Sequence, residues 1–182
     1  RTYRLKNHYP DGTTSRVYPY EVVLRPAADA VAVALYTTGG EVLLREALRP
    51  PVALVEPARA AMWELPAGLV EKGESALACA VRETAEETGF ALATPDLAPL
   101  GAPAYATPGI VAERVIFYAA RVDPSRRGEP RPDGSAVEER TNLVWLPIAE
   151  ALARCRTGDI CDLKTEVGLR RLAERLDADG RP

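Results

Sequence analysis

The sequence predicts an α/β sandwich, and three features of its 182 residues lead to this fold class. Apolar runs with the alternating or continuous pattern of strands occur in both halves of the chain. Between them, residues 75–88 contain neither Gly nor Pro and are rich in Ala and Glu, which predicts a helix. Residues 148–154 and 163–176 have the apolar stripe of amphipathic helices. A hydrophobic content of 47% suffices for one core, so we expect a single main domain.

The first strands are expected in an N-terminal segment. Residues 3–9 and 15–24 have the pattern of strands, and the Pro-Asp-Gly-Thr sequence between them combines a preset φ with a permissive glycine. We therefore expect residues 1–28 to form a small antiparallel sheet and residues 29–182 to form the main domain.

The main domain is expected to begin with a second hairpin. Residues 30–36 and 41–45 are strand-like runs on either side of a Gly-Gly pair. The proline-bearing residues 49–61 predict a loop. A second loop, bracketed by Gly68 and Gly73, must turn sharply before the predicted helix begins.

Fewer elements are expected beyond this helix, which should end at the C-cap residue Gly89. Residues 114–122 predict a strand, and residues 143–146 predict another, shorter one. Between them, residues 123–141 predict a long surface loop, and such loops are often functional. Asp162 is expected to cap the last helix.

Composition and charge exclude several classes of protein. A net charge of -3 and a pI near 5.4 argue against a basic nucleic-acid surface, so an anionic substrate needs local arginines and a metal ion. No apolar run reaches the roughly 18 residues of a membrane-spanning helix. Three cysteines without CxxC spacing indicate neither a disulfide framework nor a zinc site, and a reducing cytoplasm fits best.

The helix at residues 75–88 has an unusual acidic face. Glu83, Glu86 and Glu87 fall within a sector of roughly 100°, where like charges destabilise a helix. A divalent cation removes this conflict, because carboxylate oxygens suit magnesium or manganese. The apolar face for the core is expected on the opposite side, with Leu77, Val81, Ala85 and Thr88.

The acidic face is part of a longer pattern with fixed spacing. Gly68 is followed after five residues by Glu74, after seven more by Arg82-Glu83, and then by Glu86-Glu87 and Gly89-Phe90. Seven specified identities occur by chance at on the order of one start position in a billion. The pattern resembles the Nudix box, G-x5-E-x7-R-E-U-x-E-E-x-G-U, where U is apolar. Thr84 replaces one U, and we expect its hydroxyl to bond to the preceding turn.

The resemblance implies the Nudix fold, a mixed β-sheet between helices (α/β/α). It also implies that Mg²⁺, or Mn²⁺, is held by the carbonyl of Ala67 and the carboxylates of Glu83, Glu86 and Glu87. The ion would bridge a pyrophosphate and activate an attacking water. Arg82 would orient Glu86 or Glu74 through a charge-assisted fork.

Residues outside the box resemble the branch of ADP-ribose pyrophosphatases and nucleoside-diphosphate-sugar hydrolases. The matching segments are DAVAV at 29–33, LLREALRPP at 43–51, WELPAG at 63–68 and YATPGIVAER at 105–114. The resemblance implies a small nucleotide substrate, with ADP-ribose cleaved to AMP and ribose 5-phosphate. Other nucleotide sugars, CoA, dinucleoside polyphosphates and a sensor that binds without hydrolysis are the alternatives.

The branch also suggests substrate-binding residues, each with a simpler alternative. Arg49 would hold the diphosphate or adenylate end, or be an exposed arginine at the start of a loop. Glu64 would bind metal or ribose, or cap a turn. Pro108, Glu113 and Arg114 would lie near the substrate, although the last two could form only a surface ion pair.

The general base is expected in the loop before the last strand. Glu139 is preferred, Glu138 is second, and a glutamate of the box is the third candidate, because geometry decides such roles. Tyr18, Tyr20 and Trp63 are candidates to stack on a base ring, and His8 has no expected catalytic role. The branch, and the poor stability of an isolated hairpin, also predict a homodimer formed through residues 1–28.

Overall fold

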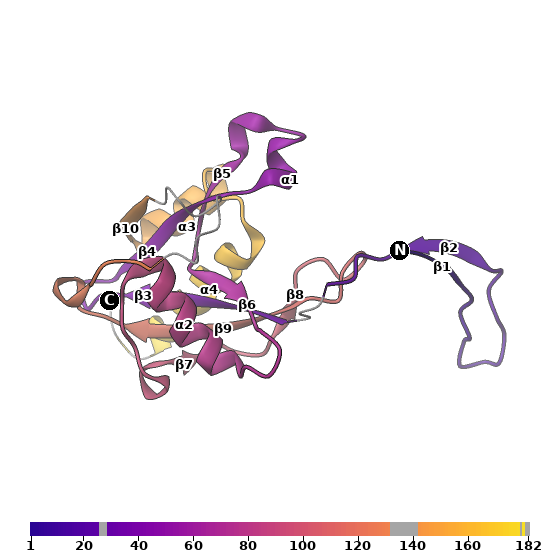
Figure 1. The fold of residues 1–182 in the computed structure, drawn as a ribbon, viewed down its shortest axis with the longest axis horizontal. Coiled ribbons are helices and arrows are strands. Elements are labelled where there is room, and N and C mark those ends of the chain that lie inside the picture. Colours follow the sequence, from indigo (N-terminus) through magenta and orange to yellow (C-terminus); the bar gives the residue numbers. More distant parts are fainter. Residues whose placement is uncertain (26–28, 132–141, 179, 181–182) are drawn as a thin grey trace.

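A mixed β-sheet forms the centre of the protein. The computed structural model describes residues 1–25, 29–131, 142–178 and 180. In this part the sheet has the order β10-β4-β3-β9-β7, with β5 paired to β4, β6 to β3 and β8 to β9 (Figure 1). The bounds are β3 Asp29–Tyr36, β4 Glu41–Leu48, β5 Ala61–Glu64, β6 Ala67–Leu69, β7 Ala98–Pro99, β8 Ala104–Tyr105, β9 Arg114–Arg121 and β10 Leu143–Pro147.

Strand β3 is buried on both faces, which explains its continuous apolar sequence. It runs parallel to β9 along its whole length and antiparallel to β4 and β6. Val31 and Val33 belong to a core cluster with residues of α2 (Ala76–Thr88), whereas Ala32 and Ala34 belong to a cluster with residues of α3 (Ile148–Thr157) and α4 (Leu163–Ala178). The helices therefore cover both faces of the sheet, and the predicted α/β/α sandwich is confirmed (Figure 1).

Helix α2 begins and ends where the sequence predicts. Ser75 is the N-cap, with its hydroxyl oxygen accepting from the Ala78 N–H at 3.1 Å. Gly89 ends the helix with a φ of 80°, which favours glycine. Asp162 likewise caps α4, since its carboxylate accepts from the Thr165 N–H at 2.9 Å.

The predicted buried face of α2 was partly wrong. Thr88 is fully buried and Val81 packs against a core cluster, but Leu77 is exposed and Ala85 is only partly buried. The residues against the sheet are instead Cys79, Ala80, Thr84, Glu87 and Thr88. Apart from Glu87 these side chains are small, which lets the helix approach β6 closely enough for Glu83 and Glu87 to reach that strand.

The expectation for Thr84 was also wrong in detail. Its side chain is fully buried, but its hydroxyl has no hydrogen-bond partner among the residues that the structure describes. The bond to the preceding turn is made instead by Thr88, whose hydroxyl donates to the Thr84 carbonyl at 2.5 Å.

Residues 49–61 are more regular than the predicted loop. They contain α1 (Pro50–Ala53) and the 3-10 helix η1 (Pro57–Arg59), and both begin with a proline. Proline is well suited to the first helical position, because its φ is preset and its missing N–H would be unpaired there. This excursion projects from the sandwich between β4 and β5, with Leu54 and Val55 strongly exposed (Figure 1).

The N-terminal hairpin extends away from the sandwich. Strand β1 (Thr2–Leu5) pairs antiparallel with β2 (Tyr18–Glu21), and a bridge joins His8 to Thr14 beside the predicted turn (Figure 1). The paired strands are shorter than expected. The base of the hairpin is attached to the main domain, because the Tyr20 hydroxyl donates to the Gly109 carbonyl at 2.6 Å.

The segment after β9 returns to the end of α2. It contains the 3-10 helix η3 (Pro124–Arg126); another 3-10 helix, η2 (Thr94–Asp96), precedes β7. The N–H groups of Gly128 and Arg131 donate to the carbonyls of Gly89 and Glu86, at 2.9 and 2.8 Å. The beginning of the predicted long loop is thereby fixed against the last turn of α2.

The cysteines and the helices of the structure bear on two expectations from composition, the lack of a disulfide framework and of a membrane-spanning helix. All three cysteines lie in the described residues, and each is a free thiol. Among the described helices, none combines the length and the apolar character that crossing a membrane requires.

Candidate active site

Arg82 holds the acidic face of α2 together. Its Nε and Nη2 donate to the two carboxylate oxygens of Glu74, both at 3.0 Å, and its Nη1 donates to Glu83 and Glu86 at 2.7 and 3.0 Å. Arg82 therefore contacts both glutamates that were considered as its partner. The hydrogen bonds from Arg82 lower the pKa of Glu74, and those with Glu74 raise the pKa of Arg82.

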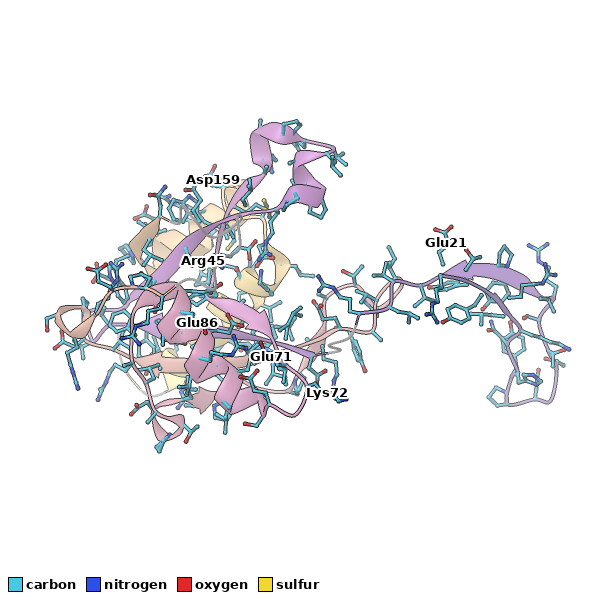
Figure 2. The ribbon with its side chains drawn as sticks, in the orientation of Figure 1. Glu21, Arg45, Glu71, Lys72, Glu86 and Asp159 are labelled. Atoms are coloured by element: carbon cyan, nitrogen blue, oxygen red, sulfur yellow. The ribbon has the colours of Figure 1, made fainter. Side chains whose placement is uncertain are left out.

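Glu71 and Lys72 lie exposed in the loop before α2, while Glu86 lies on the helix itself (Figure 2). Burial raises the pKa of the Cys79 thiol to about 12, so this thiol is protonated at neutral pH and is no nucleophile.

Glu87 is the buried member of the acidic face. One of its carboxylate oxygens forms an ion pair with Arg45 of β4, and the other accepts from the Ala67 N–H at 2.9 Å. In an extended strand the N–H and C=O of one residue point to the same edge. The Ala67 carbonyl is thus directed toward the side of β6 on which Glu87 lies.

Gly68 is required for close approach, not for a turn. It lies in β6, paired with Val31, and a Cβ atom built on it would lie 1.8 Å from Glu83 Oε1. Only glycine lets the Glu83 carboxylate lie against this strand. The sharp turn expected of both loop glycines belongs to Gly73 alone, which has a φ of 88°.

These donors fit a divalent cation in chemistry and place. Three carboxylates and a backbone carbonyl are hard oxygen ligands, and the Arg82 Nη1 between Glu83 and Glu86 shows that a positive group is accommodated there. Within the described residues no three acidic, cysteine or histidine side chains converge as a ready-made metal site. To hold a metal ion, Glu83 and Glu86 would exchange their contacts with Arg82 for contacts with the ion.

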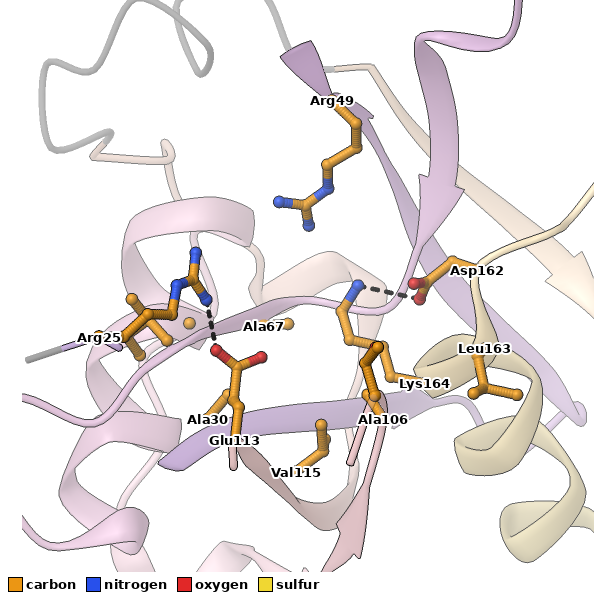
Figure 3. A pocket seen from close by; sticks show the side chains of 13 residues that line it. Arg25, Ala30, Arg49, Ala67, Ala106, Glu113, Val115, Asp162, Leu163 and Lys164 are labelled. Atoms are coloured by element: carbon orange, nitrogen blue, oxygen red, sulfur yellow. Dashed lines mark hydrogen bonds and ion pairs between the residues drawn. The ribbon is translucent and has the colours of Figure 1, made fainter. Parts of the chain in front are cut away.

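A pocket of about 390 Å³ opens beside this face. Its wall carries three cations, Arg25, Arg49 and Lys164, and two acids, Glu113 and Asp162 (Figure 3). The other lining residues come mainly from β3, β6 and the segments around β8 and β9: Ala30, Ala67, Gly68, Leu69, Ala106, Thr107, Val115 and Leu163.

A buried carboxylate behind this wall fixes two of the cations. Glu64, at the end of β5, accepts from Arg49 Nε at 2.7 Å and also pairs with Arg49 Nη2 and Lys164 Nζ. Burial would raise the pKa of Glu64, but the hydrogen bond from Arg49 and the charge of Lys164 lower it overall. Lys164 also contacts Asp162 at 2.9 Å. Arg49 and Lys164 thus point into the same space (Figure 3).

Each cation of the pocket is paired with a carboxylate. Arg25 pairs with Glu113, Arg49 with Glu64 behind the wall, and Lys164 with both Glu64 and Asp162. A doubly charged diphosphate would find its countercharges already shared with protein carboxylates. A bound divalent cation on the adjacent acidic face would supply the missing positive charge.

The predicted substrate residues are distributed unevenly around this pocket. Arg49, Ala67 and Glu113 line it, whereas Glu64 lies behind it. Pro108 follows the lining residue Thr107 but does not itself line the pocket, and Arg114 forms a fork with Asp29, at 2.8 and 2.6 Å, at the exposed start of β9. Glu138 and Glu139 lie outside the described residues.

The candidate stacking aromatics lie away from the pocket lining. Trp63 packs against the core cluster on the α4 side, and Tyr18 and Tyr20 form an edge-to-face pair on the hairpin at 6.4 Å. Sequence reasoning missed Arg25 and Lys164 as pocket residues and saw Asp162 only as a cap. No local pattern identifies Arg25, while Lys164 could have been noticed only as a cation beside a predicted helix N-terminus.

Comparison with known proteins supports the family that the pattern in residues 68–90 resembles. The family model described as NUDIX domain matches residues 26–160. A GDP-mannose pyrophosphatase of Citrobacter koseri is 32% identical over 138 residues, which are 70% of this chain and 69% of the relative. The enzyme of the same name from Yersinia pestis is 36% identical over 127 residues, or 69% of this chain and 61% of the relative.

A solved structure has the same fold. The crystal structure described as ADP compounds hydrolase matches with a TM-score of 0.74 over 100% of this chain and 88% of that chain. The sequence identity is 20%, so this likeness establishes the fold. It extends over the N-terminal hairpin as well as the sandwich.

Proposed function

Because the chain belongs to the Nudix family and is a pyrophosphohydrolase, we propose that it cleaves the diphosphate of a nucleoside diphosphate linked to a sugar. One observation carries this proposal most directly. Ala67 and Gly68 line the pocket. The Ala67 N–H also donates to Glu87 of α2, and the Glu83 carboxylate lies against Gly68. The predicted metal ligands and the pocket cations therefore face the same short strand, as hydrolysis of a bound diphosphate requires.

Mg²⁺, with Mn²⁺ as the alternative, would be held by the Ala67 carbonyl and by Glu83, Glu86 and Glu87. When bound, the ion supplies charge stabilisation on the phosphoryl oxygens and a more acidic water. The protein's own part is to keep these ligands in register. Arg82 lies between Glu83 and Glu86, which would exchange its Nη1 for the ion, and it holds Glu74 in a two-bond fork at the start of the helix.

Arg49 and Lys164 are proposed to bind the diphosphate. Both are oriented by the buried Glu64, so their side chains lose little freedom when the substrate binds. Glu113, paired with Arg25 on the opposite wall, is proposed to contact the remainder of the substrate, with Pro108 and Arg114 in the surrounding loop. In the reaction, water adds to one phosphorus, the bridging P–O bond breaks, and a nucleoside monophosphate and a sugar phosphate form.

The general base is proposed to be Glu139, or Glu138, in the segment that the sequence predicts to be a loop. The anchoring of Gly128 and Arg131 on the last turn of α2 supports this proposal, because it places residue 131 beside Glu86. A base within hydrogen-bond reach of the attacking water is the geometric requirement.

Two substrates within the proposed class are favoured by different observations. The segments at 43–51 and 105–114 resemble those of ADP-ribose pyrophosphatases, which favours cleavage of ADP-ribose to AMP and ribose 5-phosphate. The relatives described above are named GDP-mannose pyrophosphatases, which favours a guanosine diphosphate sugar. A purine nucleoside diphosphate sugar satisfies both.

A hydrolysis screen tests this proposal. ADP-ribose, GDP-mannose, ADP-glucose, UDP-glucose, CoA and diadenosine polyphosphates would be incubated with the protein and Mg²⁺ or Mn²⁺, and monophosphate products would be separated by chromatography. We expect the highest kcat/KM for ADP-ribose or GDP-mannose. Good turnover of CoA or a diadenosine polyphosphate, with none of either sugar nucleotide, would contradict the substrate class.

Two variants test the proposed metal ligands in the same assay. Glu86→Gln and Glu87→Gln are each expected to lower turnover by about a hundredfold, the scale of losing one electrostatic stabiliser of the transition state. Glu71→Gln is the control, because Glu71 is exposed in the loop before α2. Its turnover should equal that of the unmodified protein. Undiminished turnover of both ligand variants at saturating Mg²⁺ would refute the metal site.

A further inference from the structure

The buried ion pair between Arg45 and Glu87 links the acidic face to the sheet. Arg45 lies in the middle of β4, and the two side chains are 6% and 1% exposed. The other arginine of the site, Arg82, is 29% exposed and pairs with different glutamates. Two arginines therefore pair with the acidic face: Arg82 on its solvent side and Arg45 in the protein interior.

The pair reaches beyond Glu87 itself. While one oxygen of Glu87 contacts Arg45, the other accepts from the Ala67 N–H at 2.9 Å, so the carboxylate is fixed by donors from two strands. Arg45 is also the partner of Glu64 in the pairing of β4 with β5. Arg45 therefore lies between the acidic face of α2 and Glu64, the carboxylate that holds Arg49 in the pocket wall.

Stability alone does not account for such a pair. Removing two charges from water costs free energy that their attraction often fails to recover, and apolar residues of similar volume are frequently as stable or more so. What an arginine adds at this place is direction. Its planar guanidinium donates Nη1 to one defined oxygen of Glu87, whereas the rotatable ammonium of a lysine would fix the carboxylate less well.

We infer that Arg45 is a positioning residue for metal binding. It sets the orientation of Glu87 and, through Glu87, that of the Ala67 peptide, so that ligands from α2 and β6 are aligned before an ion arrives. This inference rests on the proposed function, since it takes Glu87 and Ala67 to be ligands. Partners that orient metal ligands typically contribute 10- to 100-fold in metal affinity.

The test is Mn²⁺ binding to the purified protein without substrate, measured by electron paramagnetic resonance of the free ion. Arg45→Lys keeps the positive charge but replaces the planar guanidinium by a compact ammonium, so any change in affinity reports orientation and not repulsion. We expect a loss of about tenfold in Mn²⁺ affinity. Arg170→Lys is the matched control, because it makes the same replacement in an ion pair with Glu166 at an exposed site of α4, and it should bind Mn²⁺ normally.

A second pair of variants keeps the test decisive if Arg45→Lys folds poorly. Glu87→Gln alone is compared with Arg45→Met plus Glu87→Gln, which removes both buried charges. If Arg45 acts only through Glu87, the two bind Mn²⁺ equally. Wild-type affinity in Arg45→Lys, or a further loss in the double variant compared with Glu87→Gln, would overturn the inference. An unmodified protein that hydrolyses nothing and binds no Mn²⁺ would instead refute the proposed function.

Discussion

Gly68 shows how the absence of one side chain permits the acidic face to form. The Glu83 carboxylate occupies the space that a Cβ atom at position 68 would need. Because this carboxylate is the far end of a flexible side chain, an added methyl group should displace Glu83 and leave the strand pairing of β6 intact. The glycine is thus required by the site more than by the fold.

We therefore predict that Gly68→Ala loses activity while keeping most of its stability. Turnover should fall by about a hundredfold, the usual result of displacing a reacting or positioning group by about 1 Å. The free energy of unfolding in urea should change by no more than about 1 kcal/mol. Gly39→Ala, where an added Cβ would meet only an ordinary contact at 3.5 Å, is the control. A parallel loss of stability and activity would contradict this prediction.

Glu64 predicts a dependence of stability on pH. Its pKa in the folded protein lies below the ordinary value of 4.5, as burial is outweighed by Arg49 and Lys164. Between the two values the unfolded chain binds more protons, so stability rises with pH there. The contribution of Glu64 is thus complete above about pH 4.5 and is lost as the pH falls through the folded value.

Denaturant titrations of the unmodified protein and of Glu64→Gln between pH 3 and pH 7 test this expectation. The variant should be less stable at pH 7, because Arg49 and Lys164 lose a shared buried partner, and its stability should fall less steeply on acidification. Equal slopes in the two proteins would show that Glu64 does not couple folding to protonation.

At the scale of elements, α2 and the segment after β9 are joined through two glycines. Gly89 has a φ of 80°, and a Cβ on it would lie 2.2 Å from the carbonyl oxygen of Gly128. Gly158 ends α3 with a similar φ of 83°, yet an added Cβ there would meet nothing within 4 Å. The two helix ends share one backbone requirement and differ in their surroundings.

This pair of helix ends yields a matched prediction. Gly158→Ala should cost about 1 kcal/mol, the strain of a left-handed alanine. Gly89→Ala should cost clearly more and should also lower turnover, since residues 128–131 must move away from the end of the helix that carries Glu86. Equal losses in the two variants, measured by thermal unfolding and by hydrolysis, would argue that the contact with Gly128 is unimportant.

At the scale of the whole molecule, the N-terminal hairpin lacks a core of its own. It extends from the sandwich, and its apolar side chains remain exposed (Figure 1). Those exposed side chains are Tyr3, Leu5, Tyr9, Val17, Tyr20, Val23 and Leu24. A two-stranded hairpin is at best marginally stable alone, so this surface favours a partner.

We propose that a second copy of the chain covers the hairpin. Sedimentation at micromolar concentration should give a dimer, and a chain without residues 1–21, which keeps Arg25 in the pocket wall, should give a monomer. A monomer before truncation would refute the homodimer, and a dimer that survives truncation would place the interface elsewhere.

Local rules were sufficient for part of this molecule. The helix at residues 75–88, its caps and the contact of Arg82 with Glu86 follow from propensity and from a spacing of four residues. The strands around it follow from apolar runs. In each case the interacting groups are within a few residues of each other, so the backbone conformation alone brings them together.

Tertiary structure decided the rest. Arg45 and Glu87 are 42 residues apart, and Lys164 and Glu64 are 100 apart, so their meeting depends on the strand order and on where α4 packs. The buried face of α2 was misjudged for the same reason, since the close approach to β6 selects small residues over Leu77. The sequence by itself determined the helix, its acidic face and the family, because these depend on neighbours along the chain. The pocket, its paired charges and the orientation of Glu87 depend on neighbours across the sheet, which only the folded chain brings into contact.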